Sequence, residues 1–99
     1  MLTFDEVSIK NAAAASKRAF DNGDNLYCVY YPRTGQLDYR FGPKNHPAAD
    51  KPWIPNGFVV PLEVVKSPAS VEDLKAMIDA ACRKVLEKHP NRKDLRGKL

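Results

Sequence analysis

The sequence predicts an α+β domain with the element order α-β-β-β-α, in which two helices pack on one face of a three-stranded antiparallel sheet. Three observations predict this class: helical periodicity near both ends of the chain, a hairpin turn in its first half, and an alternating apolar stretch after it. With 99 residues, the chain can form one small core and not two. We therefore expect a single domain over residues 1–90 and a basic, flexible tail over 91–99.

The first helix is expected at about residues 5–21. Thr3-Phe4-Asp5-Glu6 fits a capping box, and Ser8 would serve equally as a cap one turn later. At about 100° per residue, a single stripe collects Ile9, Ala12, Ala13, Ser16 and Phe20. Asn22-Gly23 then supplies a left-handed stop. Because the stripe consists largely of small residues, this helix should lie close to whatever it covers.

The hairpin from Leu26 to Phe41 sets the register on which the site prediction depends. Pro32-Arg33-Thr34-Gly35 is typical of a four-residue turn, in which proline fixes its own φ and Gly35 supplies the left-handed residue. The pairs expected on the core face are Tyr30/Leu37, Cys28/Tyr39 and Leu26/Phe41. The pairs expected on the outer face are Tyr31/Gln36, Val29/Asp38 and Tyr27/Arg40. The outer face is more aromatic than a strand that merely faces water requires.

Residues 42–56 follow the hairpin with four prolines and no apolar period, which favours an irregular connection with polyproline character. Connections of this length in compact domains tend to be functional. The next stretch, Phe58 to Val65, alternates in the manner of a strand. Pro61 cannot donate to a ladder, which indicates an edge strand or a bulge.

The final helix has the clearest boundaries in the sequence. Ser70 and Asp73 form a capping box, acidic residues occupy the first turn, basic residues crowd the last, and Pro90 prevents continuation. The inward stripe is expected to contain Val71, Leu74, Ile78, Ala81, Cys82 and Val85. Packing the apolar stripes of both helices on one face of the sheet would leave the other face open.

The net charge of +4 is concentrated at the end of the chain. Residues 83–99 carry seven Lys and Arg against two Asp and Glu, whereas residues 1–82 carry nine against ten. Four cations of the tail are expected to be unpacked, and a specific electrostatic role is weighed for them against simple solvation: Arg92, Lys93, Arg96 and Lys98.

The sequence gives little reason to expect catalysis. Cys28 and Cys82 are interpreted as small buried hydrophobes, with a disulfide left open if they lie within about 7 Å. His46 is expected on a surface loop, and His89 at a helix end has a structural or capping role. The carboxylates form no defensible acid–base pair, and there is neither a phosphate-cradling loop nor metal-ligand spacing. We expect a non-enzymatic protein without cofactor or metal.

The chain is also expected to be intracellular and to lie outside the membrane. Its apolar runs are shorter than the roughly 18 residues that a membrane span needs. The start of the sequence lacks the basic and apolar regions of a secretory signal. A cytoplasmic location is therefore favoured.

The leading hypothesis is a small inhibitor, adaptor or regulatory module that binds a protein partner through the outer hairpin face and the 43–56 loop. The candidate contact residues are Tyr27, Val29, Tyr31, Arg33, Asp38, Arg40, Lys44, His46 and Trp53. Two alternatives stay open. The proline loop, with Trp53 folded down, would cover the same face within the molecule. A homodimer would close it through the open face or pair through an edge strand.

A second hypothesis is single-stranded nucleic-acid binding, with tyrosine and arginine stacking on the outer face and the basic tail contacting phosphates. The nearly neutral body of the chain counts against it. The element order is also that of the double-stranded RNA-binding domain, but the sequences differ at both of that family's binding elements. The hairpin turn here is Pro32-Arg33-Thr34-Gly35, and the last helix opens with the acidic Ser70-Val71-Glu72-Asp73. The sequence is therefore assigned to no family.

Overall fold

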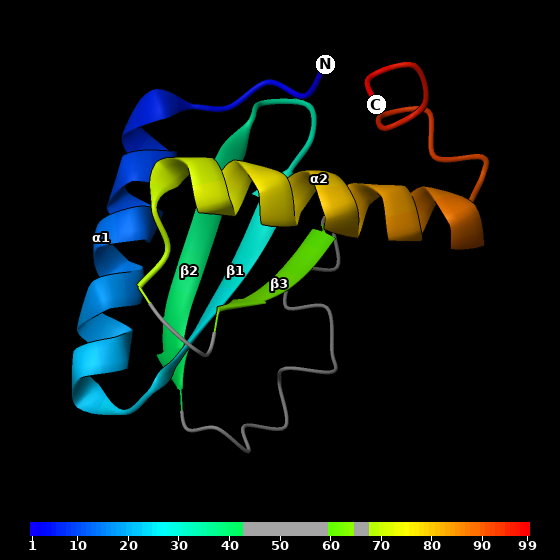
Figure 1. Ribbon diagram of the computed structural model, residues 1–99. Coiled ribbons are helices and arrows are strands. Elements are labelled where there is room, and N and C mark those ends of the chain that lie inside the picture. The colour runs from blue at the N-terminus through cyan, green and yellow to red at the C-terminus, as the bar shows by residue number, and fades with distance from the viewer. Residues whose placement is uncertain (43–59, 65–67) are drawn as a thin grey trace.

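The α+β class is confirmed in the computed structural model, which describes residues 1–42 and 68–99 and the backbone of residues 60–64. Two helices pack against an antiparallel hairpin and contact each other (Figure 1). The elements in chain order are α1 (Glu6–Asn22), β1 (Asn25–Tyr31), β2 (Gln36–Gly42), β3 (Val60–Val64) and α2 (Val71–Lys88).

The predicted hairpin register is confirmed at every pair, from Tyr31 opposite Gln36 to Leu26 opposite Phe41. Gly35 has a φ of 78°, and its amide donates to the Tyr31 carbonyl oxygen at 2.8 Å, which closes the turn. The core-face residues of β1 are buried, as expected, and Tyr30 is the largest of them. Phe41 differs from the expectation and is 43% exposed, because it lies near the end of an outer strand.

The backbone of β3 runs antiparallel to β1 along the edge opposite β2, so the strand order is β2-β1-β3. The Leu37 amide donates to Ser8 Oγ and therefore does not donate to a carbonyl oxygen of β1. Because hydrogen-bonded and non-hydrogen-bonded pairs alternate in an antiparallel ladder, Val29 turns its backbone groups toward β2. Pro61, opposite Val29, then needs no ladder donor, which is consistent with an edge position.

Helix α1 packs through small side chains, although its inward stripe is rotated from the expected one. The buried residues are Ile9, Ala12, Ala15, Ser16 and Ala19. Phe20, expected on this stripe, is 51% exposed, and Ala13 is only partly buried. A stripe of alanines allows the helix backbone to approach the sheet more closely than a phenylalanine would.

The N-terminus of α1 is capped by Asp5, so both expected caps, Thr3 and Ser8, are wrong. The Asp5 side chain accepts from the Ser8 amide at 2.9 Å, and the helix ends at Gly23 with a φ of 73°, as predicted. Thr3 cannot cap the helix because it lies in an extended segment against the hairpin. Its carbonyl oxygen accepts from the Tyr30 hydroxyl at 2.6 Å.

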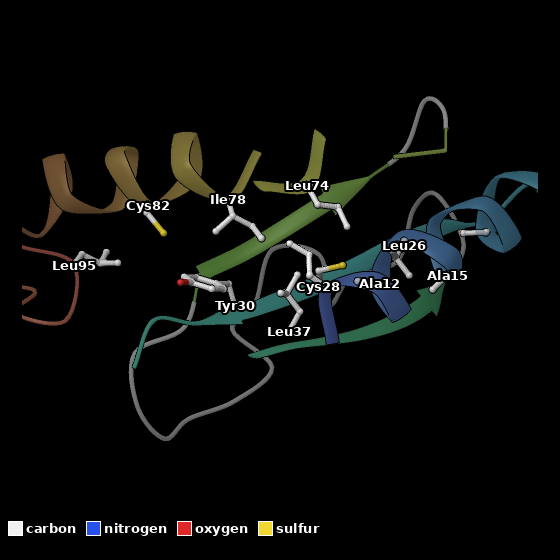
Figure 2. Packing of buried hydrophobic residues seen from close by; sticks show 12 residues of the cluster. Ala12, Ala15, Leu26, Cys28, Tyr30, Leu37, Leu74, Ile78, Cys82 and Leu95 are labelled. Carbon is white, nitrogen blue, oxygen red and sulfur yellow. The ribbon is translucent and has the colours of Figure 1, made fainter. Parts of the chain in front are cut away.

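Helix α2 is confirmed with its capping box, in which Ser70 and Asp73 each accept from the other's backbone amide. Leu74, Ile78 and Cys82 are buried, and the remaining residues of the predicted stripe pack at the margin of the core (Figure 2). Ser16 links the two helices, because its hydroxyl accepts from the Ala69 amide at 2.8 Å just before α2. Neither described helix is long and apolar enough to cross a membrane.

The expectation that the cations of the tail would be unpacked is wrong for Arg92 and Lys98, because residues 91–99 fold back onto α2 and Lys98 Nζ donates to the Pro32 carbonyl oxygen at 3.2 Å. Leu95 is fully buried and lies near Cys82 below the helix (Figure 2). Arg92 donates to both carboxylate oxygens of the buried Asp94, at 3.0 and 2.8 Å. A buried leucine and a bidentate ion pair to the buried Asp94 carboxylate hold this segment in place, whereas Lys93 and Arg96 are exposed.

Replacing Gly35 by alanine should destabilise the protein by about 2 kcal/mol or more. The added Cβ would meet the Thr3 carbonyl oxygen at 2.8 Å, in addition to the cost of the positive φ. Gly23→Ala is the matched control, since Gly23 also has a positive φ but has open space around its Cβ position. Urea denaturation measures both variants, and equal losses would contradict the close contact.

Replacing Leu95 by alanine should lower the free energy of unfolding by about 2–4 kcal/mol, because it empties a fully buried site. The matched control is Leu99→Ala, which removes the same atoms from a side chain that is only partly buried. Chemical denaturation followed by circular dichroism measures the difference. A Leu95→Ala variant as stable as the parent would show that the tail is not docked in solution.

Candidate interaction surface

The outer face of the hairpin is less open than the sequence predicts. Tyr27 and Val29 are 4% and 2% exposed, so the expectation that both lie on an open surface is wrong. Both belong to β1, which has β2 along one edge and β3 along the other. The flanking strands enclose these side chains on both sides in the plane of the sheet, which contributes to their burial.

The outer-face residues of β2 remain accessible. Gln36, Asp38 and Arg40 are exposed, and Tyr31 opposite Gln36 is partly exposed. The Tyr31 hydroxyl donates to Asp38 Oδ2 at 3.0 Å, which joins the two strands near the turn. Partial burial, together with this hydrogen bond and the Asp38 charge, raises the pKa of Tyr31. This hydroxyl therefore serves as a hydrogen-bond donor.

The outer edge of β2 is a second accessible feature, and the sequence did not predict it. Because the Leu37 amide points away from β1, alternation also directs the backbone groups of Tyr39 and Phe41 outward. Ser8 Oγ satisfies the Leu37 amide at 3.1 Å. The outward groups of Tyr39 and Phe41 have no hydrogen-bond partner in the part of the chain that the structure describes.

Aromatic side chains line this edge on the helix side. The rings of Tyr39 and Phe41 meet edge to face with their centroids 6.0 Å apart. The Arg18 guanidinium of α1 lies over the Phe41 ring, 5.7 Å from its centroid. We call the outward backbone groups of Tyr39 and Phe41, with the side chains of Arg18, Asp38 and Arg40, the β2 edge.

The other candidate residues fall into two groups. Arg33 is exposed in the hairpin turn, as a contact residue must be. Lys44, His46 and Trp53 lie outside the described residues, and so does the expectation that Trp53 covers the sheet. The partner-binding role stays a prediction for all of the sites named from the sequence.

The described groups do not present an activated nucleophile. Burial raises the pKa of the Cys28 thiol to about 12. Burial, with the nearby Asp79 charge, raises that of Cys82 to about 11. Both cysteines are free thiols, and the described residues contain no group of three or more side chains suited to a metal ion. A shallow hollow of about 370 Å³ is lined by Arg83, Leu86, Glu87 and Leu99.

Comparisons with protein-family models, curated proteins and solved structures found no match.

Both cysteines should resist modification by a thiol reagent in the native protein at pH 8, since each is buried and its raised pKa keeps it protonated. Both should react rapidly in denaturant. With a reagent that releases a chromophore on reaction, the rise in absorbance measures the rate. Ala76→Cys provides an accessible thiol on α2 as a positive control. Native thiols that react as fast as this control would contradict the described core.

Proposed function

We propose that this chain is a small, non-enzymatic binding module of the inhibitor, adaptor or regulatory type. It engages a protein partner through its hairpin, by accepting an extended segment of the partner along the β2 edge. The proposed fold is the full α-β-β-β-α arrangement, a three-stranded antiparallel sheet with both helices on one face. The proposed location of the protein is intracellular.

One observation carries the proposal: the outward backbone groups of Tyr39 and Phe41 are unpaired within the described part of the chain. Strand edges of this kind accept another strand unless something covers them. Ser8 covers the edge at Leu37, so an added strand would pair beyond that point. The site is therefore short, and side-chain contacts must supply much of its affinity.

Side chains on both faces of β2 support a specific partner. Because side chains alternate along a strand, one set of partner residues would meet Tyr39 and Phe41, and the other set would meet Asp38 and Arg40. Arg18 adds a cation beside the aromatic pair. The favoured partner sequence thus places an apolar residue against Phe41 and an acidic residue near Arg18.

The stacking hypothesis for single-stranded nucleic acid has less support. Among the hairpin tyrosines, Tyr27 and Tyr30 are buried. Tyr31 and Tyr39 are partly exposed, but the register directs them to opposite faces of the sheet. Successive bases need rings side by side on one surface, and the described hairpin does not offer that arrangement.

The test uses random peptides displayed on phage and selected on the immobilised protein, followed by calorimetric titration of the best peptide. Phe41→Ala removes the ring, whereas Phe41→Pro also removes the outward amide and leaves the β1 ladder intact. We expect Phe41→Ala to weaken binding by about 1 kcal/mol or more, and Phe41→Pro to weaken it by about 1 kcal/mol further.

Lys10→Ala is the matched surface control, since Lys10 is exposed on α1 and belongs to neither face of β2. Denaturation curves establish that each variant is folded. Equal affinity of the two Phe41 variants would contradict strand addition. Self-association of the free protein that Phe41→Pro abolishes would identify a second copy of the chain as the partner.

A further inference from the structure

The docked tail, residues 91–99, has hydrogen bonds of its own that hold its shape. In the described part of the chain, the amides of Arg92, Leu95, Arg96 and Lys98 donate to carbonyl oxygens three or four residues earlier. The ion pair of Arg92 with Asp94 also joins two residues of the tail. Because these interactions connect neighbours in sequence, they fix the conformation of the tail and would move with it.

Side-chain contacts with the body of the protein hold the tail in its place. Leu95 is fully buried in the core cluster. Lys98 Nζ donates to the Pro32 carbonyl oxygen in the hairpin turn. Leu99 is partly buried and lines the shallow hollow beside the last turns of α2 (Figure 1). The position of the tail therefore depends strongly on the burial of one large apolar side chain.

The connection between α2 and the tail is exposed. The helix ends at the C-cap His89, and His89, Pro90 and Asn91 are all exposed. Proline cannot continue the hydrogen bonding of the helix, so the chain is free to change direction at this point. A change of backbone angles here would move the tail without breaking a buried contact of α2.

The tail covers one end of the core. Figure 2 shows Leu95 beside Cys82 at one end of the cluster, whereas Cys28 lies in the middle, near Ala12 and Leu37. Both thiols are buried in the closed protein. Removal of the tail would therefore uncover Cys82 and leave Cys28 enclosed by the sheet and α1.

We infer that the tail is a strap that opens and closes as one unit while the hairpin and both helices stay folded. Opening takes Leu95 out of the core and admits solvent and small reagents to the core at Cys82. It costs much less than global unfolding, which also exposes the other members of the core cluster. The strap is separate from the β2 edge and does not depend on the proposed function.

Labelling of the two thiols by iodoacetamide in the native protein tests the strap. Trypsin separates the thiols, since Cys28 lies in the peptide 19–33 and Cys82 in the peptide 76–83, and mass spectrometry then gives both rates in the same molecule. Cys82 should react at least about tenfold faster than Cys28, because its exposure requires only the tail to open. Equal rates would show that both thiols wait for global unfolding and would overturn the strap.

A destabilising change far from the tail distinguishes opening of the strap from unfolding of the domain. Gly23→Ala places a side chain at a positive φ at the end of α1, which should raise the globally unfolded population about fivefold or more. Labelling of Cys28 should accelerate by the same factor, whereas labelling of Cys82 should not change. Acceleration of both thiols by one factor would overturn the strap.

A change within the tail should act directly on the opening. Leu95→Ala should accelerate the labelling of Cys82 about 30-fold or more, unless the rate first reaches that of the same thiol in urea-denatured protein. The control is Lys93→Ala, which truncates an exposed side chain of the tail and should leave the rate unchanged. An unchanged Cys82 rate in Leu95→Ala would overturn the strap. Circular dichroism establishes that each variant is folded.

Hydrogen exchange tests whether the tail opens as one unit. The amides of Leu95 and Arg96 are both hydrogen-bonded to the Arg92 carbonyl oxygen. Their protection factors should agree with each other, and with the factor by which native structure slows the labelling of Cys82 relative to denatured protein. Protection that differs between the two amides would show fraying residue by residue and would overturn opening as a unit.

Discussion

The packing of the hairpin turn against the segment that precedes α1 is the constraint on which the rest of the structure depends. Gly35 approaches Thr3 so closely that a Cβ would not fit, and the Asp5 amide donates to the Gly35 carbonyl oxygen at 2.8 Å. Asp5 is also the N-cap of α1, so this contact joins the hairpin turn to the start of the helix. Ser8, one turn into the helix, then reaches the amide of Leu37. Turn, helix start and strand edge therefore form one unit.

Features set by neighbouring residues were predictable from the sequence. The hairpin register follows from Pro32 and Gly35, the end of α1 from Gly23, and the start of α2 from the Ser70–Asp73 box. In each case a few dihedral angles or a local hydrogen bond determine the outcome. The same holds for the burial of Cys28, since the register assigns it to the core face.

Features set by contacts distant in sequence were not predictable. Periodicity placed Phe20 inward because its helical spacing puts it on the stripe that begins at Ile9, but close packing selects Ala15 and Ala19. Val29 was expected to be exposed because the hairpin alone leaves it open, and β3 then adds a neighbour on its other side. Leu95 gave one overlooked signal, since a large apolar side chain in an otherwise polar segment is a candidate for burial.

The residues of the candidate site were likewise predictable where neighbouring residues determine their positions, and not where distant contacts do. Asp38 and Arg40 were correctly expected on the accessible part of the hairpin, since their exposure follows from register and from the outer position of β2. Arg18 was missed, because its approach to Phe41 depends on where α1 crosses the sheet. The fold-back of residues 91–99 was missed as well, because charge counting gives the composition of the tail but not its geometry.

The hairpin register also determines what the β2 edge can offer to a partner. A slip by one residue would turn Tyr30 out of the core, so the paired hairpin has no second register. The same register turns the amides of Leu37, Tyr39 and Phe41 away from β1, and Ser8 Oγ accepts from that of Leu37. A strand added at Tyr39 and Phe41 would therefore meet backbone groups whose positions the core already fixes.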